Sequence, residues 1–123
     1  MNKKILIIED DQFIRDLYAH ELQKEGYAVT TCEDAEKGAK ELTQNSYDLI
    51  LLDIMLPGKS GLDFMKDYLE KKKKNAKNFI LLTNIGQDAV IKQALELGAS
   101  GYFIKSSYAP HELVREINNY FEE

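Results

Sequence analysis

The sequence has very little cysteine and no long hydrophobic run. Cys32 is the only cysteine, which excludes an internal disulfide and a metal site built from cysteines, so we interpret it as a small buried residue at the end of a strand. The apolar run near the N-terminus, residues 5–8, is too short for a signal peptide or a membrane span. We therefore expect a cytoplasmic protein that has no membrane partner.

Basic residues are also too few to balance the acidic ones. Lysine and arginine total 16 against 21 aspartates and glutamates, which gives a formal net charge of -5. Surfaces that bind nucleic acid need clustered cations to neutralise phosphates, so we expect no direct nucleic-acid partner. Charged residues make up 30% and hydrophobic residues 44% of the 123 positions, a balance typical of a folded soluble domain. We predict one globular domain over residues 1–123.

Five short runs of apolar residues, rich in branched side chains, alternate with five segments of helical periodicity. The apolar runs cover residues 5–8, 27–31, 49–52, 79–83 and 102–104, and the helical patterns cover residues 14–22, 35–42, 62–69, 90–95 and 113–121. Runs that are apolar throughout, such as 49–52, suit strands that helices bury on both faces. The alternation predicts an α/β fold with a doubly wound, five-stranded parallel sheet and five helices.

Acidic side chains follow two of the predicted strands. Glu9, Asp10 and Asp11 end the first run, and Asp53 ends the third. Ligand sites of such sheets lie outside the carboxyl ends of the strands, and a flavodoxin-like order makes the first and third strands neighbours. Carboxylates crowded there repel one another and need a cation, and their hard oxygen atoms suit Mg²⁺. The sequence predicts a magnesium site here, although a helix cap is an equally good interpretation of Asp11.

A hydroxyl group and a lysine follow two further strands. Thr83 ends the fourth run and Lys105 follows the fifth, so both face the same edge of the sheet as the carboxylates. Phosphoryl transfer needs mainly positioning and neutralisation of charge, and an aspartate can itself be the nucleophile. Taken singly, Thr83 would be an ordinary β-branched strand residue. As a set, these residues indicate phosphate chemistry centred on Asp53.

Four stretches of the chain resemble the receiver domains of two-component response regulators in order and spacing. They cover residues 5–11, 51–61, 81–83 and 98–105, and they read ILIIEDD, LLDIMLPGKSG, LLT and GASGYFIK. The resemblance extends over the whole chain. It implies the flavodoxin-like strand order 2-1-3-4-5 and a role in signal transduction.

The resemblance also implies roles for the acidic residues. Asp53 is expected to accept a phosphoryl group from a sensor histidine kinase or a phosphotransfer protein, with Mg²⁺ as the cofactor. Asp10, Asp53 and the backbone carbonyl of Met55 are expected to bind the ion directly, whereas Glu9 acts through a water molecule.

A conformational switch is the second implication of the resemblance. Thr83 and Lys105 are expected to contact the phosphoryl oxygens, and Tyr102 matches an aromatic residue that turns inward when the threonine moves toward the phosphate. Phosphorylation then shifts the population of two states. The face made by the fourth helix, the fifth strand and the fifth helix is expected to bind a downstream protein target or a second copy of the chain.

The sequence departs from the receiver pattern at two positions. The family usually has a proline joined to the lysine by a cis bond, whereas Ser106 follows Lys105 here, and a cis bond without proline costs about 3 kcal/mol. Lys105 reaches the site either through such a bond or from a trans peptide with a longer loop. Asn84 follows Thr83 where the family often has a small residue, and we expect it to alter the lifetime of the phosphorylated state.

Two other functions fit parts of the pattern. Phosphatases of the haloacid-dehalogenase type also use an aspartate and Mg²⁺, but Met55 replaces the second aspartate that donates the proton in those enzymes. A pseudo-receiver would be a protein-binding module of the same fold that no longer uses phosphate, which Ser106 favours and the intact site residues oppose. We expect no conventional enzyme, because the chain would catalyse only its own phosphorylation and dephosphorylation.

Overall fold

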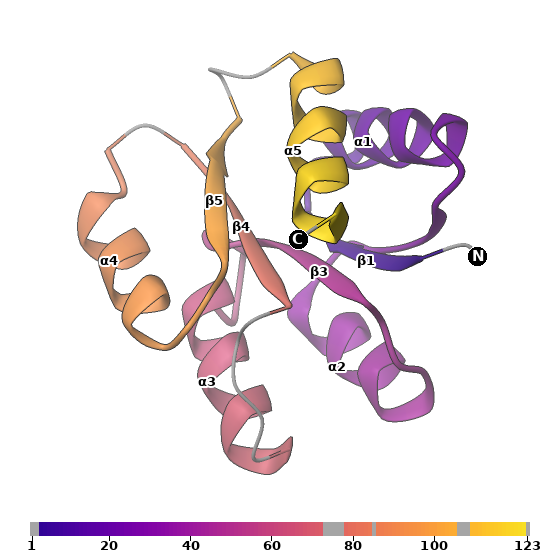
Figure 1. The fold of residues 1–123 in the computed structure, drawn as a ribbon. Coiled ribbons are helices and arrows are strands. Elements are labelled where there is room, and N and C mark those ends of the chain that lie inside the picture. The colour runs from indigo at the N-terminus through magenta and orange to yellow at the C-terminus, as the bar shows by residue number, and fades with distance from the viewer. Residues whose placement is uncertain (1–2, 73–77, 85, 106–108, 123) are drawn as a thin grey trace.

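The computed structural model describes residues 3–72, 78–84, 86–105 and 109–122, in which strands and helices alternate (Figure 1). The strands are β1 (Lys4–Ile8), β2 (Ala28–Cys32), β3 (Leu49–Asp53), β4 (Phe79–Thr83) and β5 (Gly101–Ile104). The helices are α1 (Gln12–Lys24), α2 (Ala35–Gln44), α3 (Gly61–Lys72), α4 (Asp88–Glu96) and α5 (Pro110–Glu122). No helix of the described ranges is both long enough and apolar enough to cross a lipid bilayer.

The strands form one parallel sheet in the order β2-β1-β3-β4-β5, which confirms the predicted fold and strand order. β1 lies between β2 and β3, and Ile8 pairs with Cys32 on one side and with Leu52 on the other. The register places Asp53 beside Leu82, one residue before the end of β4. The carboxyl ends of β1, β3 and β4 therefore meet at one edge, where the acidic residues were predicted to gather.

Helices cover both faces of the sheet. α1 and α5 pack on one face, where Tyr18, Leu22 and Ile117 enter the core, and α2, α3 and α4 pack on the other (Figure 1). The three inner strands are buried on both faces, and every residue of β3 and β4 is buried. Burial of both faces explains why their sequences are apolar throughout rather than alternating.

Local signals begin and end the helices as the sequence indicates. Asp11 and Asp34 cap α1 and α2: their side chains accept hydrogen bonds from the backbone N–H groups of Ile14 (3.1 Å) and Lys37 (2.8 Å). Gly26 follows α1 with a φ of 104°, a left-handed conformation that suits glycine. Of the two interpretations left open for Asp11, the structure shows the helix cap.

Candidate functional site

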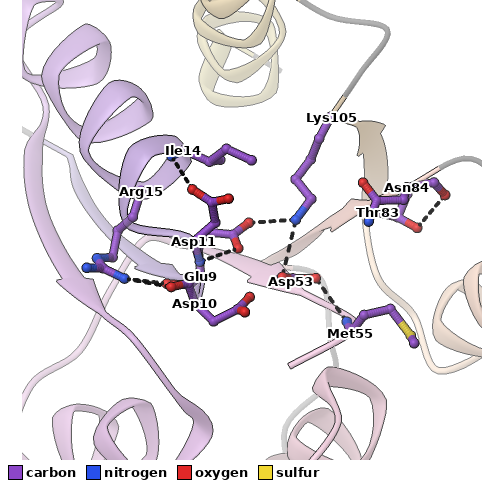
Figure 2. Close-up of polar contacts among 10 residues, drawn as sticks. All are labelled: Glu9, Asp10, Asp11, Ile14, Arg15, Asp53, Met55, Thr83, Asn84 and Lys105. Atoms are coloured by element: carbon purple, nitrogen blue, oxygen red, sulfur yellow. Dashed lines mark hydrogen bonds and ion pairs between the residues drawn. The ribbon is translucent and has the colours of Figure 1, made fainter. Parts of the chain in front are cut away.

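Three carboxylate groups converge at the carboxyl edge of the sheet (Figure 2). Glu9 and Asp10 follow β1, and Asp53 ends β3 next to it. Each of the three offers one oxygen atom, and these atoms all lie within 4.8 Å of one another. Glu9 and Asp53 are buried, whereas Asp10 is exposed to solvent. The fold thus brings together the three side chains that the sequence predicts as metal ligands.

Lys105 provides a positive charge between two of these carboxylates. Its Nζ atom donates hydrogen bonds to Glu9 Oε1 at 2.9 Å and to Asp53 Oδ2 at 3.2 Å. Only 8% of its side chain is exposed, so these ion pairs are nearly dry. The backbone N–H of Lys105 donates to the carbonyl of Thr83 at 2.8 Å, which ties the end of β5 to the end of β4. A buried lysine is therefore fixed within reach of Asp53.

Burial and charge shift the pKa values of these groups. Burial raises the pKa of Glu9 from 4.5 to about 7, and its hydrogen bond with Lys105 offsets only part of this effect. Burial acts to lower the pKa of Lys105, but its interactions with Glu9 and Asp53 outweigh burial and raise it. Partial burial of Asp10 is likewise outweighed by hydrogen bonding with Asp53 and Glu9, which lowers its pKa. One lysine shared by two buried carboxylates cannot compensate fully for the burial of Glu9.

The residues around Asp53 fix the orientation of its carboxylate. Asp53 Oδ1 accepts a hydrogen bond from the backbone N–H of Met55 at 2.9 Å, while Oδ2 faces Lys105. Gly61, the first residue of α3, lies against this turn: a Cβ atom there would be 2.3 Å from the Asp53 carbonyl oxygen and 2.6 Å from the Ile54 Cα. Only glycine allows α3 to begin this close to Asp53.

The two residues of the predicted switch, Thr83 and Tyr102, lie on β4 and β5. Thr83 is fully buried, and its hydroxyl donates to the carbonyl of Asn84 at 3.2 Å. Within the part of the chain that the structure describes, this hydroxyl makes no hydrogen bond with Asp53 or Lys105. Tyr102 lies on β5 with 44% of its surface exposed. The Tyr102 side chain, which the resemblance expects to turn inward, is therefore exposed to solvent in this structure.

Two predictions from the sequence depend on residues at the limits of the described structure. The Lys105–Ser106 peptide lies outside the described residues, so the predicted alternatives for its geometry stay predictions. Met55 is described and is 52% exposed, and the role of its carbonyl as a metal ligand stays a prediction.

Sequence reasoning missed two residues of the site, Gly61 as a close-contact position and Arg15. Arg15 donates from Nη1 to the backbone carbonyls of Glu9 and Asp10. Both interactions are made with backbone atoms, which no side-chain motif records. The spacing of Arg15 from the acidic residues, one to two helical turns along the chain, was the one available signal.

Comparison with known proteins identifies the family. The model of the response regulator receiver domain matches residues 5–118. The chain belongs to this family. It is a receiver domain of two-component response regulators. The transcriptional regulatory protein ResD of Bacillus subtilis (strain 168) is 35% identical over 114 residues, which are 93% of this chain and 46% of ResD. This receiver chain spans about half the length of the curated relatives that it matches.

Solved structures agree with this assignment. The chemotaxis response regulator CheY4 of Vibrio cholerae has a TM-score of 0.87 at 23% identity, over 98% of this chain and 99% of CheY4, and it shows the same fold. The receiver domain of DrrB, described as activated by BeF3, has a TM-score of 0.83 at 26% identity and covers 100% of both chains.

Proposed function

We propose that this receiver domain takes a phosphoryl group onto Asp53 in a reaction that requires Mg²⁺. The observation that supports this most directly is the position of Lys105, whose ammonium group contacts Asp53 and Glu9 in a nearly dry setting. Such a cation neutralises negative charge that arrives on Asp53.

The donor set fits Mg²⁺. Three carboxylate oxygens within 4.8 Å of one another form a hard, anionic group, and one buried lysine leaves part of the negative charge uncompensated. Asp10 and Asp53 would hold the ion directly with the carbonyl of Met55. Glu9, whose oxygens accept from Lys105 and from the Asp11 N–H, would act through a water molecule, as the resemblance implies. When bound, Mg²⁺ supplies positive charge to the oxygens of the phosphoryl group.

The transfer step needs no further protein nucleophile. An oxygen of the Asp53 carboxylate attacks phosphorus, the P–N bond of a donor phosphohistidine breaks, and the electron pair returns to the imidazole, which then takes up a proton. Lys105 would contact one oxygen of the transferred group. Thr83 would contact another after its hydroxyl leaves the Asn84 carbonyl. In this sense the chain catalyses its own phosphorylation and dephosphorylation and is not a conventional enzyme.

The movement of Thr83 would be coupled to Tyr102 on the neighbouring strand. Tyr102 and Leu95, both exposed, border a shallow hollow between α4 and β5. An inward turn of Tyr102 changes the shape of this hollow. We therefore assign the output of the domain to the face made by α4, β5 and α5, where a downstream protein or a second copy of the chain would bind.

The proposed partners follow from the same chemistry. A sensor histidine kinase or a phosphotransfer protein would supply the phosphoryl group in the cytoplasm, where the chain would act as one receiver domain over residues 1–123. The BeF3-activated state named for the DrrB receiver domain supports this proposal, because beryllofluoride has the tetrahedral shape and charge of a phosphoryl group.

Mass spectrometry of the intact protein tests the proposal. After incubation with acetyl phosphate and Mg²⁺, the wild-type protein should gain the mass of one phosphoryl group, and the chelated sample and Asp53→Asn should not. Asp48→Asn is a matched control, because Asp48 is exposed at the opposite end of β3 and should leave the mass gain unchanged. If the wild type gains no mass, or Asp53→Asn gains as much, the chain is a phosphate-independent pseudo-receiver.

A further inference from the structure

Arg15, in the first turns of α1, contacts the backbone of the turn that carries the acidic residues. Its Nη1 atom donates to the Glu9 carbonyl at 2.9 Å and to the Asp10 carbonyl at 3.3 Å. Figure 2 shows its guanidinium group on the side of this turn opposite to Asp53. Among the described residues, Arg15 forms no ion pair with a carboxylate. We propose that Arg15 is a positioning residue, which holds the turn in the shape that presents Asp10 to Mg²⁺.

The turn is fixed on either side of Asp10. Before it, the N–H of Glu9 donates to the Cys32 carbonyl at 3.0 Å, which continues the pairing of β1 with β2. After it, the N–H of Asp11 donates to Glu9 Oε2 at 3.0 Å, and Asp11 caps α1. Arg15 binds the two carbonyls between these points. Its charged N–H groups make hydrogen bonds that are stronger than those of a neutral donor.

The acidic turn needs this support because its carboxylates repel one another. Glu9 and Asp53 are buried and fixed, but Asp10 is exposed and would lower the repulsion by turning outward into water. Arg15 limits that movement by fixing the peptide groups on both sides of the Asp10 Cα, which sets the direction in which the Asp10 side chain leaves the backbone. A site assembled before the ion arrives binds it more tightly, because the ordering of Asp10 is completed during folding.

This inference rests on the proposed Mg²⁺ site and predicts a specific change in it. Arg15→Met keeps an unbranched side chain of high helix propensity but removes both hydrogen bonds. The dissociation constant for Mg²⁺ should rise about tenfold, a factor typical of one lost charge-assisted hydrogen bond. Arg15→Lys keeps the charge but not the planar guanidinium group, so its dissociation constant should lie between those of the wild type and Arg15→Met.

Whether the dissociation constant for Mg²⁺ rises or falls in Arg15→Met distinguishes a positioning role from a purely electrostatic one. A positive charge near a magnesium site repels the ion, so removing it would tighten binding if charge were its only effect. Lys24→Met is the matched control, since it removes a cation from the other end of α1, where the exposed Lys24 pairs with Glu21. We expect this control to leave Mg²⁺ binding unchanged.

Isothermal titration of Mg²⁺ into the full chain, at fixed ionic strength, measures the dissociation constants of the four proteins. Initial rates of phosphorylation by acetyl phosphate, measured over a range of Mg²⁺ concentrations, provide a second readout. For Arg15→Met the half-saturating Mg²⁺ concentration should rise while the rate at saturation stays near that of the wild type. Urea unfolding in a chelator shows that each variant is folded.

Each outcome has a defined meaning. Weaker Mg²⁺ binding by folded Arg15→Met, with the Lys24→Met control unchanged, supports the inference. Equal or tighter binding overturns it, and so does a loss of rate that saturating Mg²⁺ does not restore. If Arg15→Met does not fold, Arg15→Lys decides by the same criteria. A wild-type protein that binds no Mg²⁺ and gains no phosphoryl group contradicts the proposed function instead, so the two failures are distinguishable.

Discussion

The two halves of the carboxyl edge of the sheet are held in different ways. At the ends of β1 and β3, both oxygens of Glu9 and both oxygens of Asp53 accept hydrogen bonds from Lys105 or from a backbone N–H group. On β4 and β5, the hydrogen bond of the Thr83 hydroxyl among the described residues is to the carbonyl of the next residue, and Tyr102 is 44% exposed. The carboxylates of the first half are thus held by a lysine from a distant segment as well as by local N–H groups, whereas the Thr83 hydroxyl of the second half has a local partner.

This difference matches two physical requirements of the proposed function. A site that collects negative charge must be ordered in advance, because mobile carboxylates would separate. An element that changes state must have two arrangements close in free energy, so that a few new hydrogen bonds shift the population. Lys105 connects the halves, since it follows β5 and contacts Asp53 at the end of β3.

Removing Lys105, which connects the two halves, should have the largest effect on the rate of phosphorylation. Lys105→Met leaves Glu9 and Asp53 without their shared cation, and the rate of phosphorylation by acetyl phosphate at saturating Mg²⁺ should fall by about 100- to 1,000-fold. The rate of mass gain of the intact protein measures this change. Lys37→Met, which removes a cation from an exposed pair with Glu33, should keep the wild-type rate. An unchanged rate in Lys105→Met would show that the lysine is only structural.

The pH dependence of stability should report the burial of Glu9 in the acidic half. The pKa of Glu9 is about 7 in the folded protein against an ordinary value of 4.5, so the folded state binds this proton more tightly. The resulting stabilisation is fully present below pH 4.5 and is lost as the pH rises through 7. The free energy of unfolding of the metal-free protein should fall by up to about 3 kcal/mol over this range.

Urea unfolding at a series of pH values, in the presence of a chelator, measures this dependence. Glu9→Gln is the matched variant, since it keeps the size of the side chain and removes its titration. Its stability should lack the part of the pH dependence that belongs to Glu9. Identical profiles for the two proteins would mean that the acidic half is not strained by burial of Glu9.

The smallest effect on stability is expected in the other half. Thr83→Val keeps the shape of the side chain and removes one local hydrogen bond of 3.2 Å, so the free energy of unfolding should change by less than about 1.5 kcal/mol. NMR signals of the Tyr102 ring should nevertheless stop responding to phosphorylation. Thr43→Val, which removes a hydroxyl bonded to the Lys40 carbonyl on α2, should leave that response intact. If the Tyr102 signals of Thr83→Val still respond to phosphorylation, Tyr102 is not coupled to the Thr83 hydroxyl.

Much of the fold could be predicted because its signals are local. Continuous apolar runs predicted the inner strands, and β4 has the predicted bounds of residues 79–83. The second strand covers residues 28–32 rather than the predicted 27–31, and the N–H of Tyr27 bonds instead to the Leu22 carbonyl of α1. Cys32 is buried at the end of β2, as predicted.

The candidate site was predictable in its membership and less so in its interactions. Glu9, Asp10, Asp53 and Lys105 gather as their positions after the strands indicate. The role of Gly61 beside the Asp53 carbonyl was not visible, because it depends on how closely α3 approaches β3. Arg15 was missed because a cation on an amphipathic helix is usually only a solvated side chain.

The sequence by itself determined the order of strands and helices and the chemical groups that follow each strand, because periodicity and residue type are properties of neighbouring positions. Only the tertiary structure decided that Lys105 lies between Glu9 and Asp53, which are 96 and 52 residues away along the chain. It also decided that Glu9 is buried and that the Thr83 hydroxyl faces Asn84. Distances and local dielectric arise from the packing of distant segments, and both the pKa values and the proposed chemistry depend on them.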